Sequence, residues 1–147
     1  MIYPQTFASE VSKNIDAIGK YGCLAMCYLY CVGIRDNALE YIRILSDCMN
    51  KGILDNECTV LNASKFLEYV TGRKFYVTKE QFNDLKKIKE PYPVRYVYNG
   101  KGHWVVVQNG KIVFNSLINS QCVTKGKPDT KENTRVIKLA RQSLWTL

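Results

Sequence analysis

The amino-acid sequence predicts an α+β fold in which a helical N-terminal half packs on a C-terminal antiparallel β-sheet. Up to Pro93, apolar residues recur mainly at the three- and four-residue spacing of amphipathic helices. After Pro93 they form short runs rich in β-branched and aromatic residues, which is typical of strands. The stretch from Tyr21 to Ile34 contains no Asp, Glu, Lys or Arg, so it predicts a helix buried on nearly every side.

The helices of the first half are marked by apolar spacing and by residues that favour helix ends. A stripe of Phe7, Val11, Ile15 and Ile18 predicts the first helix, and the uncharged stretch continues from it. Two further amphipathic patterns begin after residues that favour N-caps and stop before glycines. The expected helices run from Phe7 to about Gly19, from an N-cap at Asp36 or Asn37 to just before Gly52, and from about Asn62 to Gly72.

One more helix is expected between a short strand at Phe75–Val77 and the sheet. Thr78-Lys79-Glu80-Gln81 has the form of a capping box, in which the first and last side chains bond to backbone N–H groups of a helix start. Phe82, Leu85 and Ile88 follow at helical spacing. This helix must end before Pro91, because proline lacks the backbone N–H that a helix interior needs.

The C-terminal half predicts an antiparallel meander. Asn-Gly pairs between apolar runs favour tight hairpin turns, because both residues tolerate a positive φ. A polar segment from Asn119 to Thr134 predicts a long loop before the last strand. The expected strands are Val94–Tyr98, His103–Gln108, Lys111–Asn115 and Arg135–Leu139, with turns at Asn99–Gly102 and Asn109–Gly110.

Length and charge limit the class of protein. The 147 residues suit a single domain, residues 1–147, and nearly half of them are apolar, which excludes a disordered tail. The net charge of +8 favours an anionic partner, such as nucleic acid, an acidic cell-wall polymer or an acidic protein. No recognised nucleic-acid-binding motif is present. A basic surface exposed to solvent explains each single run of lysines equally well.

The N-terminal residues and the cysteines indicate a compartment. Met1–Gln5 has neither a basic nor an apolar signal region, and the longest apolar run is shorter than the roughly 20 residues of a membrane span. We therefore expect a cytoplasmic protein whose six cysteines are reduced. Cys23, Cys27 and Cys31 recur along one helix face, which does not match common zinc or iron–sulfur spacings. We expect no metal and no cofactor, and interpret Cys27 and Cys31 as packed side chains.

Three residues form a candidate catalytic site. Cys23 follows Gly22 at the start of the buried helix, where N–H groups of the first turn favour a thiolate. A thiol nucleophile needs an imidazole to take its proton, and His103 is the single histidine of the chain. Pairing across the Asn109-Gly110 turn places Asn115 opposite Trp104, one residue from His103, and a small bulge would let its amide reach the ring.

These residues resemble the papain-like cysteine hydrolases. Gly22-Cys23 opens a buried helix, Gly102-His103 precedes an apolar strand, and Asn115-Ser116 closes the next strand, in that chain order. Among compact forms the chain is most similar to bacteriocin-leader (double-glycine) processing peptidases and related phage-encoded domains, with the CHAP cell-wall amidases and peptidases further off. The resemblance implies a papain-like fold, with Cys23 as nucleophile, His103 as general base and then acid, and Asn115 as the orienting residue. It also implies a substrate cleft at Tyr21, Gly22, Gly102 and Trp104.

The sequence departs from the papain-like pattern at one position. Those enzymes usually carry a glutamine about six residues before the cysteine, whose amide helps to hold the oxyanion, and Ala17 occupies that position here. Gln5 and Asn14 are the nearest upstream amides and are the candidates to replace it. Loss of an oxyanion donor typically costs about 10²- to 10³-fold in rate.

Two functions follow from these observations. The first is a cysteine peptidase or amidase that acts on a peptide or peptidoglycan-like substrate through a thioester on Cys23. The alternative is a catalytically degenerate papain-like binding module, encoded by a phage or mobile element and associated with a host macromolecule or a virion, that engages an anionic partner through its basic, tyrosine-rich surface. A metal or iron–sulfur protein that uses the cysteine cluster is a weaker third hypothesis.

Overall fold

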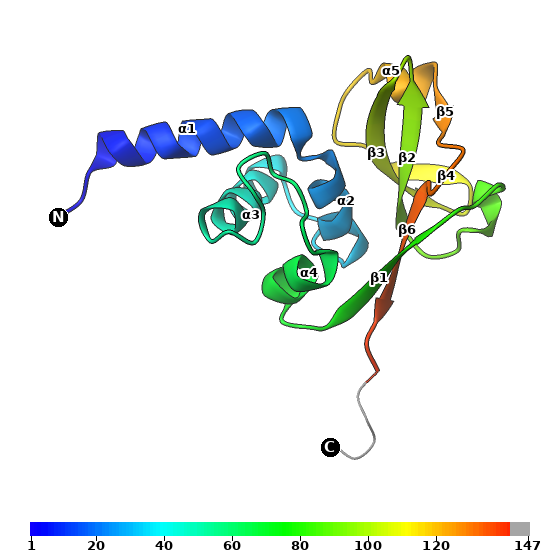
Figure 1. Cartoon of the computed structure of the whole chain (residues 1–147), viewed down its shortest axis with the longest axis horizontal. Coiled ribbons are helices and arrows are strands. Elements are labelled where there is room, and N and C mark those ends of the chain that lie inside the picture. Colours follow the sequence, from blue (N-terminus) through cyan, green and yellow to red (C-terminus); the bar gives the residue numbers. More distant parts are fainter. Residues whose placement is uncertain (142–147) are drawn as a thin grey trace.

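The fold is α+β, with helices α1 to α4 in the N-terminal half and a six-stranded sheet with the short helix α5 in the C-terminal half (Figure 1). The structure is a computed structural model that describes residues 1–141. The helices are α1 (Pro4–Tyr21), α2 (Cys23–Cys31), α3 (Ala38–Asn50), α4 (Ala63–Thr71) and α5 (Gln121–Thr124), with a 3₁₀ turn, η1, at Leu85–Lys87. The strands are β1 (Phe75–Glu80), β2 (Tyr92–Tyr98), β3 (Lys101–Gln108), β4 (Lys111–Phe114), β5 (Lys127–Pro128) and β6 (Thr134–Leu139).

The sheet is antiparallel, with the strand order β1-β6-β2-β3-β4, and β5 pairs with β2. The predicted meander of β2, β3 and β4 is confirmed. The β2–β3 turn is shorter than the expected turn at Asn99–Gly102. Lys101 and Gly102 already belong to β3, so only Asn99-Gly100 forms the turn. Both residues of each Asn-Gly turn have positive φ, as a two-residue hairpin turn requires.

Helix α2 lies between the other helices and the sheet, so it is buried on both sides (Figure 1). On one side Ala25, Tyr28 and Leu29 belong to the main core, which α3 and α4 complete. On the other side Cys27 packs against Trp104 and Val106 of β3. The absence of charged residues in this stretch therefore predicted its central position correctly.

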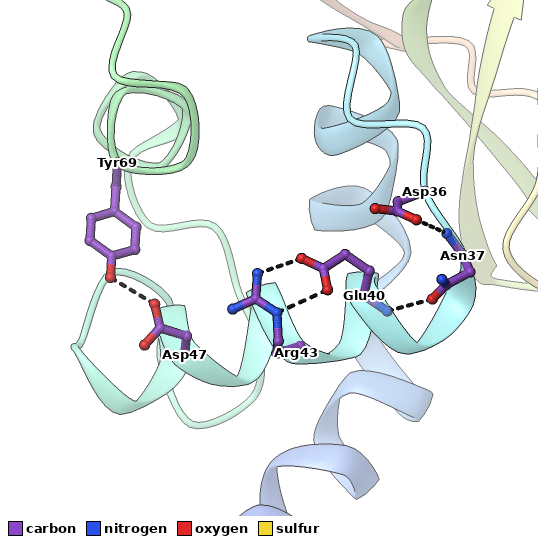
Figure 2. A network of polar contacts seen from close by, with 6 residues as sticks. All are labelled: Asp36, Asn37, Glu40, Arg43, Asp47 and Tyr69. Carbon is purple, nitrogen blue, oxygen red and sulfur yellow. Dashed lines mark hydrogen bonds and ion pairs between the residues drawn. The ribbon is translucent and has the colours of Figure 1, made fainter.

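Helices α3 and α4 are stabilised by the end residues that the sequence indicated. Asn37 is the N-cap of α3 and accepts a hydrogen bond from the backbone N–H of Glu40 at 2.9 Å (Figure 2). Asn62 caps α4 in the same way, and Gly72 ends α4 in the left-handed conformation with φ of 74°. The hydroxyl of Tyr69 on α4 donates to Asp47 on α3 at 2.7 Å, which joins the two helices (Figure 2).

Helix α1 is longer than its apolar stripe suggested, and it extends beyond the body of the molecule (Figure 1). Ile18 is buried against the main core, but Phe7 is 63% exposed and Ile15 46% exposed. The apolar stripe therefore predicted the helix correctly, but its side chains are buried only near the C-terminal end of the helix.

The prediction of a helix that begins at the Thr78–Gln81 capping box and includes Phe82, Leu85 and Ile88 is wrong. Strand β1 continues through Glu80, because it pairs with β6 from Phe75 opposite Leu139 to Glu80 opposite Thr134, and this pairing takes up the residues of the apparent capping box. The buried side chain of Asn133 then holds Phe82 by accepting from its N–H and donating to its C=O, both at 3.1 Å. Only η1 remains helical. Local helix propensity is overridden here by pairing with a distant strand.

The segment from residue 119 to 134 is more ordered than the expected loop. It contains α5 and β5, and Ser120, Cys122 and Asn133 are buried in it. Gly126 allows this close packing, because a Cβ there would lie 2.3 Å from the carbonyl oxygen of Val97. In the part of the chain that the structure describes, no helix is long and apolar enough to cross a lipid bilayer.

Candidate active site

Gly22 places Cys23 at the first turn of α2. Gly22 ends α1, where its N–H donates to the carbonyl oxygen of Ile18 at 2.9 Å, and it also serves as the N-cap of α2. A Cβ at Gly22 would lie 2.6 Å from that same oxygen, which is too close for any other residue without a backbone shift. The junction between the two helices therefore depends on glycine, and it sets the position of the Cys23 thiol.

A bulge in the β3–β4 hairpin brings Asn115 to the face of the sheet that carries His103. Next to the turn the strands pair in the two-residue register, and between Val106 and Val107 the register shifts by one residue. Without this shift Asn115 would lie opposite Trp104, whose side chain lies on the other face of β3 from that of His103. The extra residue moves Asn115 to the His103 face.

A hydrogen bond joins His103 to Asn115. Nε2 of the ring lies 2.8 Å from Oδ1 of Asn115. The backbone N–H of Leu117 donates to the same Oδ1 at 3.1 Å, which fixes the orientation of the amide. Because an amide oxygen only accepts hydrogen bonds, the proton of neutral His103 lies on Nε2. Nδ1 then carries the lone pair and is available to take a proton from Cys23.

Cys23 and His103 shift each other's pKa. Burial raises the pKa of Cys23, but the hydrogen bond and charge of His103, with the backbone N–H groups of Trp104 and Leu24, lower it below the ordinary value of a thiol. Burial lowers the pKa of His103, but its hydrogen bonds to Cys23 and Asn115 raise it above the ordinary value of histidine. Both shifts favour a thiolate beside an imidazolium.

Four other cysteines are shifted in the opposite direction. All six are free thiols. Burial raises the pKa of Cys48 to about 11 and that of Cys58 to about 12. Burial also raises the pKa values of Cys27 and Cys31, and Cys27 has no exposed surface. Cys23 is therefore distinguished from these four by its electrostatic environment as well as by its place at a helix start.

Cys23 and His103 line a cleft of about 450 Å³. Its walls come from the end of α1, the start of α2, the β2–β3 hairpin and the segment after β4. Lys20 and Lys101 also line it, and no Asp or Glu does, so the cleft is basic. Other polar side chains on its walls are those of Tyr98, Asn99, Ser116, Asn119, Ser120 and Gln121.

The structure does not bring the two candidate oxyanion amides to Cys23. Gln5 lies in the first turn of α1, roughly 25 Å along that helix from the cleft. Asn14 donates to Ser46 at 3.0 Å and to Asn50 at 2.8 Å, both on α3. Ala17, which occupies the position of the expected glutamine, packs against the main core.

The predicted cleft residues fall into two groups. Gly22 and Gly102 line the cleft, whereas Tyr21 is 54% exposed and does not. Trp104 does not line the cleft either: its backbone N–H faces the Cys23 thiol, while its ring lies beneath Arg135. Sequence reasoning missed the cleft residues at positions 119–121, because they lie in the segment expected to be a loop. The predicted turn at Asn99–Gly102 was the one sequence feature that indicated that the β2–β3 hairpin lines the cleft.

The described residues contain no group of three His, Cys, Asp or Glu side chains arranged to hold a metal ion. A comparison of the chain with family models, curated proteins and solved structures gives no match.

Proposed function

We propose that the protein is a cysteine hydrolase of papain-like fold that cleaves a peptide or amide bond through a thioester on Cys23. The observation that carries this proposal is that Cys23 and His103 line one cleft, while Asn115 holds the His103 ring through a hydrogen bond at 2.8 Å. The opposite pKa shifts of the thiol and the imidazole support it, because they favour the ionised pair in which the nucleophile is already formed.

The acylation step uses the ring nitrogen that faces away from Asn115. Nδ1 of His103 takes the thiol proton, and the thiolate of Cys23 attacks the carbonyl carbon of the substrate. The tetrahedral oxyanion then collapses, the C–N bond breaks, and the imidazolium gives its proton to the leaving amine. The acyl group remains on sulfur as a thioester. Throughout, Asn115 accepts from Nε2–H, so the ring keeps its direction while Nδ1 gains and loses the proton.

Deacylation uses the same groups with water as the nucleophile. Nδ1 of His103 takes a proton from water, and the resulting hydroxide attacks the thioester carbonyl. The C–S bond breaks, the thiolate recovers the proton from the imidazolium, and a carboxylic acid leaves. One water is consumed and Cys23 is restored.

A peptide or a peptidoglycan stem peptide is the substrate class that best fits this proposal, because Lys20 and Lys101 line the cleft and no acidic side chain does. A thiol nucleophile must stay reduced, so the proposal places the protein in a reducing compartment such as the cytoplasm.

The test is to trap the acyl group. Pooled fluorogenic peptide amides are incubated with the protein, the reaction is quenched in acid, and the mass of each cysteine-containing peptide is measured. We expect an acyl adduct on Cys23, with loss of both adduct and turnover in Cys23→Ala. Turnover that survives in Cys23→Ala would contradict the proposal.

A second candidate function is a binding module that keeps the fold without the chemistry. It is favoured by Ala17 and by the distance of Gln5 and Asn14 from the cleft. In that case Cys23→Ala binds the anionic partner as tightly as the parent protein does. Charge reversal at Lys86, Lys87 or Lys125 weakens that binding. Binding to nucleic acid would also weaken steeply with added salt.

A further inference from the structure

Two basic residues lie directly opposite each other on neighbouring strands. Lys79 of β1 pairs with Arg135 of β6 in the antiparallel register. The next pair on the same face is Val77 with Ile137, and both of these side chains pack against the main core beneath the helices. Because side chains two residues apart share a face, Lys79 and Arg135 also lie on the side of the sheet that faces the helical layer.

Lys79 and Arg135 line a hollow of about 410 Å³, which we call the basic pocket. Its other walls are Leu24 and Tyr28 of α2 and the segment from residue 60 to 64 that leads into α4. No Asp or Glu lines it, and in the described chain neither basic side chain belongs to a salt bridge. Burial raises the pKa of Tyr28, so its hydroxyl stays neutral and is available as a hydrogen-bond donor.

The charge arrangement of this pocket is unfavourable without a partner. Like charges directly opposite each other on paired strands destabilise a sheet. Arg135 lies over the ring of Trp104, 4.7 Å from the ring centroid, and donates to the backbone carbonyl oxygen of Glu132 at 3.4 Å, so among the described residues its charge has no carboxylate partner. An anion between the two cations would remove the repulsion and gain charge-assisted hydrogen bonds.

The basic pocket is a neighbour of the candidate active site. Leu24, which lines it, follows Cys23 directly, and Trp104 touches one residue of each region, with its N–H toward the Cys23 thiol and its ring under Arg135. Cys23 and Leu24 are consecutive residues that line the cleft and the basic pocket respectively, and an extended peptide advances about 3.3 Å per residue, so the inference requires only a short stretch of substrate between the two hollows.

We propose that the basic pocket binds a carboxylate side chain of the substrate, and that the protein therefore selects peptides with an Asp or Glu a few residues from the cleaved bond. This inference rests on the proposed function, since it assigns the substrate class of that same site. The carboxylate accepts from the guanidinium of Arg135 and the ammonium of Lys79, with the Tyr28 hydroxyl as a further donor. An arginine fork matches a carboxylate in geometry, which a single exposed lysine does not.

The test measures binding in a Cys23→Ala protein, so that it does not depend on catalysis. The probes are the acetylated and amidated tripeptide Gly-Glu-Gly, its neutral match Gly-Gln-Gly, and inorganic phosphate. The readout is the NMR signal of the Trp104 indole N–H, assigned with a Trp145→Phe variant. We expect the glutamate peptide to shift this signal and to bind about tenfold more tightly than the glutamine peptide.

Variants locate the binding site. Lys79→Gln and Arg135→Gln are each expected to weaken binding of the glutamate peptide about tenfold, and the exposed Lys79 position keeps the test valid if Arg135→Gln does not fold. Lys138→Gln, on the opposite face of β6, is the matched control and should bind like the parent. Equal binding of the two tripeptides, equal weakening by the control, or tighter binding of phosphate than of the glutamate peptide would overturn the assignment. If the glutamate peptide does not bind selectively but the acyl adduct on Cys23 still forms, the pocket assignment is refuted and the proposed hydrolase activity is not.

Discussion

Replacement of Asn115 by alanine tests whether one hydrogen bond fixes the His103 imidazole in the orientation that the proposed mechanism requires. Oδ1 of Asn115 accepts from Nε2 of His103 at 2.8 Å, and this partner becomes charged when His103 takes the thiol proton. A hydrogen bond to a charged group contributes about 1.5–3 kcal/mol. Its loss disfavours the ionised pair, so we expect alkylation of Cys23 by iodoacetamide at about pH 6 to slow by about 10- to 100-fold.

The assay follows the mass of the peptide that contains Cys23 as a function of time. Asn115→Asp keeps the acceptor oxygen and should retain the reactivity that Asn115→Ala loses. Ser116→Ala is the matched control, because Ser116 lines the same cleft without being the hydrogen-bond partner of the ring. If Asn115→Ala is folded by circular dichroism and Cys23 reacts at the parent rate, the orienting role of Asn115 is refuted.

Three further predictions concern stability and pH. Gly22→Ala should lower the free energy of unfolding in urea by about 1–3 kcal/mol, because the new Cβ would lie 2.6 Å from a backbone oxygen. Gly19→Ala, whose Cβ would have nothing within 4 Å, should raise the free energy of unfolding by about 0.5–1 kcal/mol. Equal effects of the two substitutions would contradict this. The alkylation rate of Cys23 should fall as the pH drops through its lowered pKa, and turnover should fall at high pH as the imidazolium is lost through its raised pKa; a single rise near the ordinary thiol pKa of about 8.5 would argue against the pair. Lys79→Gln should stabilise the unliganded protein by about 0.2–1 kcal/mol in urea, because it removes the repulsion from Arg135, and no gain would show that the cations do not interact.

The sequence predicted those parts of the fold that local residues determine. N-caps at Asn37 and Asn62, the glycine at the end of α4 and the Asn-Gly turns all act within a few residues, so their effects can be read from short segments. The uncharged stretch that contains Cys23 also located the central helix, because burial on all sides excludes charge.

The parts that sequence reasoning missed depend on distant contacts. The hydrogen bonds of Asn133 to Phe82 replace an expected helix, and no local pattern reveals them. Likewise, Lys79 and Arg135 become neighbours only when β1 pairs with β6. In the candidate site, the one-residue bulge decides which face of the sheet Asn115 occupies, and neither strand alone specifies it.

The most direct test of the central claim compares the cysteines of the parent protein with those of a His103→Ala variant. Both are treated with limiting iodoacetamide at about pH 6, where an ordinary thiol is less than about 1% ionised, and the modified cysteines are identified by peptide mass mapping. We expect Cys23 to be modified first in the parent and to lose this preference in His103→Ala. If Cys23 reacts no faster than Cys27, Cys31, Cys48 and Cys58, or if the loss of His103 leaves its rate unchanged, the two residues do not form a catalytic pair.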